Sequence, residues 1–210
     1  MNRSAPWLHR LRRDEAGVAM VEFAFVAPLM ALMIVGGIEL ANFALTHMRV
    51  SEIANTVSDN AGRVATGMDE ANVYEIFAGA GVIGNSIDFQ ERGRVVLSSL
   101  QENGNNGNAR GQKIEWQRCW GELEVEPSYG REGKGKNDGS LPNGLGKPGH
   151  RISSLGGTAV MFAEVSYQYE PIFFSSMFDA EVIRYEAALN VRDRNNRKIS
   201  NAQDLATMSC

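Results

Sequence analysis

The sequence is poor in the residues that build metal centres and disulfide-rich scaffolds. It contains two cysteines and three histidines in 210 residues. Cys119 and Cys210 are too few for a disulfide framework or a four-cysteine zinc site. The histidines, His9, His47 and His150, lie far apart and show no spacing typical of metal ligands. We therefore expect no metal site and no cofactor.

Motifs for catalysis are also missing. The sequence has no GxSxG nucleophile elbow, no HExxH motif and no CxxC pair. Residues 130–136 fit the GxxxxGK pattern of a phosphate-binding loop, but Asn137 stands where Ser or Thr would bind Mg²⁺. The glycines and prolines that follow also oppose the helix that such a loop needs. We interpret this tract as a solvated loop and expect no catalytic residue, no small-molecule ligand and no enzyme activity.

Neither sign of charge is in large excess. The chain has 21 Lys and Arg against 25 Asp and Glu, a net charge of −4, so it lacks the basic footprint of a nucleic-acid-binding protein. With 43% hydrophobic and 22% charged residues, the composition is that of a globular protein. The charge is uneven, however. In residues 1–17, four arginines exceed two acidic residues by two, which leaves −6 for the rest.

A long apolar run follows these arginines. Residues 23–38 read FAFVAPLMALMIVGGI without a charge, and mostly apolar flanks extend the run over residues 18–45. At a rise of about 1.5 Å per residue, roughly 20 apolar residues span the core of a bilayer. The run therefore predicts one transmembrane helix over residues 18–45, in contact with the lipid bilayer. The arginines before it predict a cytoplasmic N-terminus and an exported remainder.

Two simpler interpretations of this run remain open. A cleaved secretory signal would have an apolar region of roughly 7–15 residues, and Glu39 interrupts the place where its cleavage is expected. A plain membrane anchor gives no reason for Glu22, whose carboxylate would cost about 2.5–3.5 kcal/mol at the bilayer centre and less near its surface. We therefore treat Glu22 as a candidate functional residue.

The position of Glu22 relative to Gly17 suggests a role in assembly. If the bond after Gly17 is cut, Val18 becomes the first residue and its amine is positively charged near neutral pH. When such helices pack side by side with a stagger of one turn, Glu22 of one subunit can pair with the amine of its neighbour. The pair would neutralise two groups that are costly in lipid and would set the axial register of the assembly.

This segment resembles the processing site of prepilins of the tight-adherence (Flp-type) group of type IV pili, and in particular the TadE/TadG-like pseudopilins. The residues that carry the resemblance are Gly17, Glu22 and Phe23, with Pro28 and the Gly36–Glu39 stretch. The resemblance implies cleavage between Gly17 and Val18 by a prepilin peptidase and assembly through Glu22 and Phe23. It also implies other pilins or pseudopilins and an inner-membrane assembly platform as partners.

Beyond the apolar run, the sequence predicts that the helix continues. Apolar residues recur every three or four positions over residues 42–65, so we expect a helix from about residue 18 to 66, with Gly67 as its C-cap. Asp69 should cap a short helix that ends at about Ala78. The glycine-rich residues 78–86 should form a connector.

A sheet is predicted for the rest of the chain. The four candidate strands are Arg94–Leu100, Lys113–Trp120, Ala159–Tyr169 and Ala180–Val191. The first two should form a hairpin with a long loop, and residues 130–150 should form a mobile loop. The acidic residues expected to face solvent are Glu164, Glu170, Glu181 and Glu186. Together these elements predict an α+β, pilin-like fold, with one long N-terminal helix followed by an antiparallel sheet domain.

The predicted organisation has four parts. They are a cytoplasmic leader (1–17), a transmembrane helix (18–45), an amphipathic extension (46–66) and a periplasmic α+β domain (67–210). In an oxidising periplasm, a disulfide between Cys119 and Cys210 would hold the C-terminal tail; a buried free Cys119 is the alternative. The inferred function is a minor pseudopilin or assembly component of a tight-adherence pilus in the bacterial inner membrane. The alternative is an unprocessed, membrane-anchored periplasmic binding or structural module.

Overall fold

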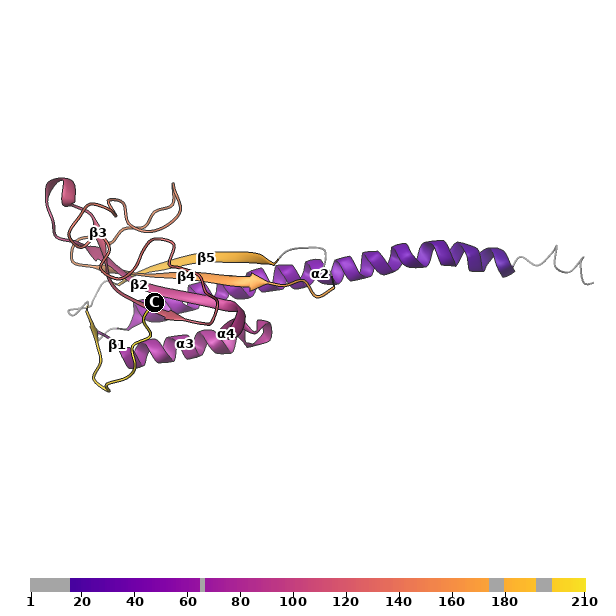
Figure 1. Ribbon diagram of the computed structural model, residues 1–210, viewed down its shortest axis with the longest axis horizontal. Helices are drawn as coiled ribbons and strands as arrows, with labels where there is room; N and C mark the ends of the chain where they lie inside the picture. Colours follow the sequence, from indigo (N-terminus) through magenta and orange to yellow (C-terminus); the bar gives the residue numbers. More distant parts are fainter. Residues whose placement is uncertain (1–15, 65–66, 174–179, 192–197) are drawn as a thin grey trace, which may run out of the picture. The chain divides into compact units, whose positions relative to one another are not determined.

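The structure is a computed structural model that describes residues 16–64, 67–173, 180–191 and 198–210. The leader residues 1–15 lie outside the described residues. The chain forms two compact units, Met1–Phe43 and Ala44–Cys210. The elements, in chain order, are α2 (Ala16–Arg63), β1 (Met68–Asp69), α3 (Glu70–Gly84), the 3₁₀ helix η1 (Asn85–Ile87), α4 (Phe89–Arg92), β2 (Gly93–Glu102), the 3₁₀ helix η2 (Gly107–Ala109), β3 (Gln112–Trp120), β4 (Ala159–Tyr169), β5 (Glu181–Val191) and β6 (Ile199–Ser200) (Figure 1).

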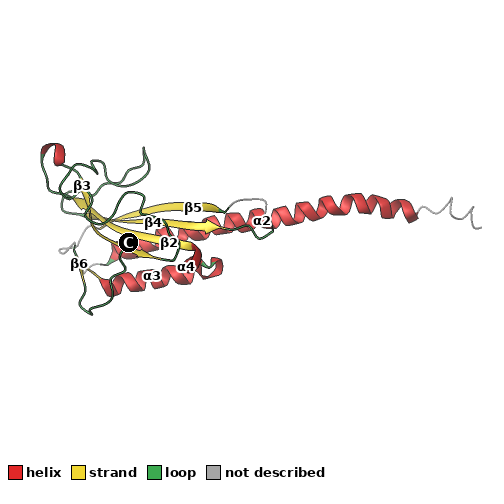
Figure 2. Cartoon of the chain, viewed as in Figure 1, coloured by secondary structure: helices red, strands yellow, loops and turns green. Residues whose placement is uncertain are grey.

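The second unit is built on a four-stranded antiparallel sheet in the order β3-β2-β4-β5 (Figure 2). Strand β2 lies in the middle, where Val95 pairs with Trp120 of β3 on one side and with Val165 of β4 on the other. Strand β5 forms the far edge and pairs with β4 along its whole length. The four strands lie at the predicted positions. The prediction of an α+β, pilin-like fold with a long N-terminal helix and an antiparallel sheet is confirmed.

Different parts of the chain cover the two faces of this sheet. On one face, Gly62 of α2 lies against Leu189 of β5, and Phe77 of α3 stacks on Trp120 of β3 with ring centroids 6.3 Å apart. On the opposite face, side chains of β2, β3 and β4 pack against the long segment between β3 and β4. The members of this cluster are Leu100, Ile114, Leu141, Leu145, Val160 and Phe162. The sheet is therefore enclosed on both sides.

Coverage on both faces explains why the central strands do not alternate between apolar and polar residues. Strand β4 is buried at nearly every position, as is β2, whereas a sheet with one wet face would show regular alternation. The prediction that Glu164 faces solvent is therefore wrong, because this residue is only 7% exposed. Glu186, its partner on β5, is half-buried, whereas Glu170 and Glu181 are exposed as expected.

The segment between β3 and β4 contributes to the core although it forms no helix or long strand. An isolated bridge joins Leu145 to Ile152. Leu141 and Leu145 are buried in the cluster on the sheet. This segment includes the predicted loop 130–150, whose mobility stays a prediction.

Helix α3 is longer than the sequence indicated. It continues to Gly84 through the glycine-rich residues expected to form a connector, and that prediction is wrong. The reason is packing: a Cβ on Gly81 would lie 3.3 Å from the Trp120 ring, and one on Gly84 would overlap Phe89. Each glycine costs about 1 kcal/mol of helix propensity, but here it lets the helix approach its neighbours closely. The Asp69 cap is confirmed, with its side chain accepting from Ala71 N at 3.1 Å.

Candidate assembly helix and the junction closed by the disulfide

The N-terminal part of α2 is the first candidate site. The helix Gly17–Arg63 is long and apolar enough to cross a membrane by length and composition. Its most apolar window has a mean hydropathy of 2.3, and none of that window is buried. Large side chains along it, such as Phe25 and Met33, are 75% and 78% exposed. A continuous apolar surface of this kind needs lipid or protein to cover it, so this part of the chain is suited to a membrane anchor.

The predicted processing and assembly residues all lie at the start of this helix. Gly17 and Val18 belong to its first turn, and a Cβ on Gly17 would meet nothing within 4 Å. Glu22 and Phe23 follow one turn later and are exposed. Because Val18 and Glu22 are four residues apart, they share one face of the helix. The structure therefore brings these residues together, while their cleavage and pairing stay predictions.

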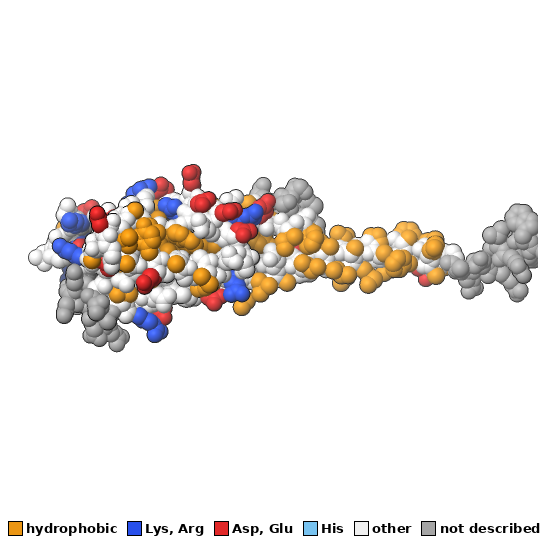
Figure 3. Space-filling model, turned by 90° about the horizontal axis from the view of Figure 1, so that it is seen from below, with side chains coloured by type: hydrophobic (Ala, Val, Ile, Leu, Met, Phe, Trp, Pro, Cys, Tyr) orange, Lys and Arg blue, Asp and Glu red, His pale blue; other side chains and the backbone are white. Residues whose placement is uncertain are grey.

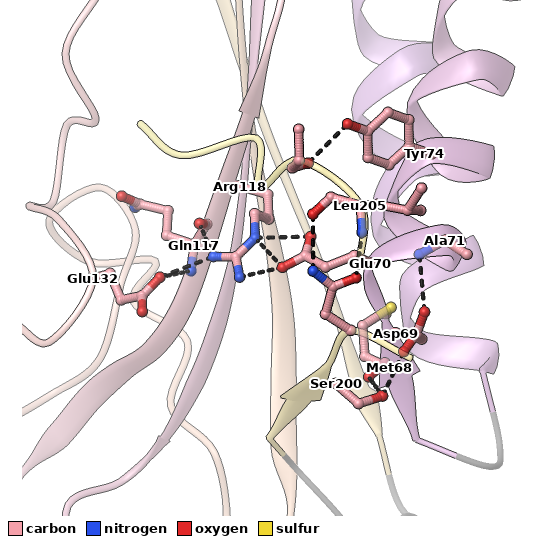
Figure 4. Close-up of polar contacts among 12 residues, drawn as sticks. Met68, Asp69, Glu70, Ala71, Tyr74, Gln117, Arg118, Glu132, Ser200 and Leu205 are labelled. Carbon is pink, nitrogen blue, oxygen red and sulfur yellow. Dashed lines mark hydrogen bonds and ion pairs between the residues drawn. The ribbon is translucent and has the colours of Figure 1, made fainter. Parts of the chain in front are cut away.

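The second candidate is a polar junction between α3, β3 and the loop that follows β3 (Figure 4). Arg118 of β3 donates from Nε to Glu70 Oε1 at 2.8 Å and to Oε2 at 3.1 Å, and its Nη2 also donates to Glu70. Its Nη1 donates to Glu132 Oε2 at 3.0 Å and to the carbonyl of Gln117 at 2.7 Å. One guanidinium thus joins three segments.

Because the Glu70–Arg118 pair is buried, each of its charges depends on the other for stability. The side chains of Arg118 and Glu70 are only 7% and 2% exposed. Burial alone would lower the pKa of Arg118, but the hydrogen bonds and charges of Glu70 and then Glu132 raise it. A buried charge that loses its partner is strongly unfavourable. The pair therefore ties the first turn of α3 to the edge strand of the sheet.

The C-terminal segment closes over the same junction. Strand β6 pairs in parallel with β1, and Asp69 Oδ2 accepts from Ser200 Oγ at 2.7 Å and from Ala202 N at 3.0 Å. These bonds, with that of Ser200 the strongest, lower the pKa of Asp69. Tyr74 of α3 donates to the carbonyl of Ala206 at 2.8 Å. Figure 4 shows the contact of Asp69 with Ser200, and Tyr74 with its hydrogen bond, beside the Glu70–Arg118 pair.

A disulfide completes the closure. Cys119, next to Arg118 on β3, is bonded to Cys210 across a sequence separation of 91 residues. Cys119 N also donates to Met208 O at 2.8 Å, and Arg131 Nη1 donates to Cys210 O at 2.6 Å. Closing a loop of this length restricts the unfolded chain by about 4–5 kcal/mol in the chain-entropy model. The bond holds the C-terminal tail as the sequence predicted, and it indicates an extracytoplasmic location for this unit.

A third polar cluster lies on the other face of the sheet. Glu164 Oε2 accepts from Ser128 N at 2.9 Å, and Tyr129 donates to Glu186 Oε1 at 2.6 Å. Within the described part of the chain, Glu164 Oε1 is buried without a hydrogen-bond partner. Burial raises the pKa of Glu164, and the nearby charge of Glu186 adds to the rise. This carboxylate is therefore more easily protonated than one in water.

Sequence reasoning missed both buried clusters, although faint signals exist for each. Glu164 interrupts the apolar run of its strand, and Arg118 stands between Trp116 and Cys119 in another. A charged residue within a buried strand needs a partner, but the sequence does not identify it. Among the described residues, no group of three or more His, Cys, Asp or Glu side chains could hold a metal ion.

An exposed apolar helix joined to a disulfide-closed α+β unit defines a pilin-like chain with an N-terminal membrane anchor. Residues 17–58 match the model of the TadE-like protein family, so this part of the chain is a TadE-like domain. The match confirms the resemblance predicted from Gly17, Glu22 and Phe23. It covers most of α2 and ends before α3, and it indicates the context of a Tad pilus system. No curated protein and no solved structure matches the chain.

Replacing Glu70 tests the junction. We expect Glu70→Gln to lower the free energy of unfolding by about 3–5 kcal/mol, because it leaves the buried Arg118 charge poorly compensated. Glu132→Gln is the matched control, since Glu132 is 52% exposed and its loss should cost about 1 kcal/mol or less. Denaturant unfolding of the oxidised protein in detergent measures both. Equal effects of the two variants would contradict the assigned importance of Glu70.

Glu164→Gln tests the buried carboxylate. The folded protein holds the Glu164 proton more tightly than the unfolded chain, so its contribution to stability is present below pH 4.5 and is lost as the pH rises through the raised pKa. We therefore expect the variant to gain stability over the wild type as the pH rises toward neutrality. The exposed Glu170→Gln should show no such trend. The test is to measure the free energy of unfolding of each protein across this pH range. Parallel curves of unfolding free energy against pH for the wild type and Glu164→Gln would refute the assignment.

Proposed function

We propose that the protein is a minor pseudopilin or assembly component of a tight-adherence (Flp-type) pilus, inserted once in the bacterial inner membrane. One observation carries the proposal: Gly17, Glu22 and Phe23 stand at the start of an exposed apolar helix, inside the segment that matches TadE-like proteins. The disulfide of the second unit supports an oxidising compartment on the far side of the membrane.

The proposed topology follows from these features. The proposed parts are a cytoplasmic leader (1–17), a membrane-spanning segment (18–45), an extension of the helix, which ends at Arg63 in the structure, and a periplasmic domain (67–210). Two features support this division. Residues 46–63 bury one apolar stripe, which includes Val50, Ile53 and Val57, against the sheet domain. The residues before them expose apolar side chains on all sides.

The start of α2 is suited to cleavage by a prepilin peptidase between Gly17 and Val18. Both residues lie in the first turn of the helix, where backbone N–H groups have no partner within the helix. Glycine lowers helix propensity further, by about 1 kcal/mol relative to alanine. The scissile bond can therefore unwind into an extended conformation at little cost and without disturbing the packed second unit.

Cleavage would create the group that Glu22 needs. The new amine at Val18 precedes Glu22 by four residues, about 6 Å along the helix axis. A neighbouring helix shifted by one turn brings its own amine level with Glu22, and the two charges neutralise each other in lipid. Phe23, 69% exposed, adds apolar contact beside the pair. In this mechanism the other pilins or pseudopilins and the assembly platform are partners of α2.

The mature N-terminus is the first measurement. We expect mass spectrometry of the protein from its native membrane to find a start at Val18 that depends on the prepilin peptidase. A start at Met1 with the peptidase present would instead support the alternative, an unprocessed membrane-anchored binding or structural module. A start near residue 45 would indicate a secretory signal and would exclude both membrane-bound functions.

Glu22→Gln tests the assembly step. The variant leaves the amine of the neighbouring subunit unpaired near the end of the span, at a cost smaller than the roughly 2.5–3.5 kcal/mol of the bilayer centre. We therefore expect incorporation into pilus assemblies to fall about tenfold, with the disulfide and the second unit intact. Glu52→Gln is the matched control, because Glu52 lies on the same helix and forms an exposed ion pair with Arg49 at 3.1 Å. Normal incorporation of Glu22→Gln would count against the mechanism.

A further inference from the structure

Exposed large apolar side chains of the second unit gather at one of its ends. Eight such side chains occur in its described residues, and five of them lie where α2 enters the unit, β4 ends and β5 begins. We call these five the apolar rim: Leu45, Met48, Ile172, Phe173 and Val182. Four of them are at least half exposed. An apolar concentration of this kind on a folded unit marks an interaction surface.

Contacts between α2 and β5 place the rim at this end. His47 lies 3.1 Å from the Tyr185 hydroxyl, and farther along both elements Gly62 lies against Leu189. The two elements therefore run in the same direction. From Tyr185 back to Glu181, strand β5 extends roughly 13 Å beyond the His47 contact, at about 3.3 Å per residue.

Strand β4 ends at the same level. Its last residue, Tyr169, pairs with Glu181, the first residue of β5. Ile172 and Phe173 follow Tyr169 within four positions and so lie at the end of the unit where Ala44 enters. Figure 1 shows the end of β4 and the beginning of β5 alongside α2.

Charged side chains accompany the rim. Arg92 pairs with Glu170 at 2.6 Å, Arg49 pairs with Glu52 at 3.1 Å, and Arg184 is exposed on β5. Figure 3 shows acidic and basic side chains on the surface beside apolar ones in this region of the unit. Arginine side chains can lie along an apolar surface while their guanidinium groups stay at the headgroups or in water, so these charges are compatible with a contact at the membrane surface.

We propose that the apolar rim inserts into the interfacial region of the periplasmic leaflet, so that the second unit rests on the same bilayer that α2 spans. The inference depends on the proposed membrane span, residues 18–45. Leu45 ends that span and Met48 follows three residues later on α2, so two residues of the rim come directly after the segment proposed to contact lipid. This continuity favours lipid as the occupant over a separate protein.

The contact has a consequence for the proposed function. A unit held to lipid at the helix exit and again at Ile172 and Phe173 has a restricted orientation on the membrane. Extraction into a filament would expose the rim to water. The rim therefore favours the membrane-bound form of the protein, as expected of a component at the base of a pilus.

Site-directed spin labelling tests the contact in the full oxidised chain. The chain is reconstituted in vesicles of phosphatidylethanolamine and phosphatidylglycerol. A nitroxide is attached to single introduced cysteines, while Cys119 and Cys210 stay joined to each other. The test variants are Ile172→Cys and Phe173→Cys. Leu155→Cys is the matched control, because Leu155 is 66% exposed and lies before β4, at the opposite end of the sheet.

We expect the labels at residues 172 and 173 to collide several-fold more with oxygen, which partitions into lipid, than with a water-soluble nickel chelate. The label at residue 155 should show the reverse. Similar nickel accessibility at residues 172, 173 and 155 would overturn the inference. Shielding of residues 172 and 173 from both reagents would also overturn it, since it would indicate a protein cover.

A label at Leu32→Cys, in the middle of the proposed span, separates this inference from the proposed function. Lipid exposure at residue 32 with water exposure at residues 172 and 173 would reject the rim contact alone. Water exposure at residue 32 would reject the membrane span, and the rim contact with it. Lipid exposure at all three positions supports both.

Discussion

The buried ion pair between Glu70 and Arg118 holds the second unit together. It joins the first turn of α3 to edge strand β3, and through Glu132 it also holds the segment that covers the opposite face of the sheet. A charge with so little access to water must keep its partner, so these segments, far apart in the sequence, are obliged to meet. The disulfide at the neighbouring Cys119 then secures the C-terminal segment over the same place. The strongest constraints of the fold thus lie at one junction.

The second unit and the apolar part of α2 are stabilised in different ways. The second unit is closed by its own contacts, whereas the apolar window of α2 has none of its surface buried. Such a helix is stable only in lipid or among other helices, which is the behaviour required of a subunit that assembles through its N-terminal segment. The match of residues 17–58 to TadE-like proteins falls on this part of the chain. The family match therefore falls on the helix, which is also the segment through which we propose that the protein assembles.

Patterns of local origin were predicted well. The long helix, the four strands, the Asp69 cap and the disulfide all follow from composition, periodicity or residue type, and the structure contains them. The failures have a common cause. The glycines of α3 resembled a connector, because the sequence does not show that they let the helix pack closely against Phe89 and against Trp120, which is distant in sequence. The short elements β1, β6 and α4 were missed because two to four residues carry no period. Glu164 was placed in solvent because its cover comes from the segment between β3 and β4, where Ser128 N donates to its carboxylate.

The sequence by itself determined the apolar helix, the arginines that precede it and the spacing of Gly17, Glu22 and Phe23. These features depend on residues that are neighbours along the chain, so they can be recognised without knowledge of the fold. Only the tertiary structure decided which charges are buried, which face each strand presents and how the apolar side chains of the rim come together. Those properties depend on pairs such as Glu70 with Arg118 or His47 with Tyr185. Desolvation and packing depend on distances in the folded structure. A local sequence pattern therefore does not identify a partner that is distant in the chain.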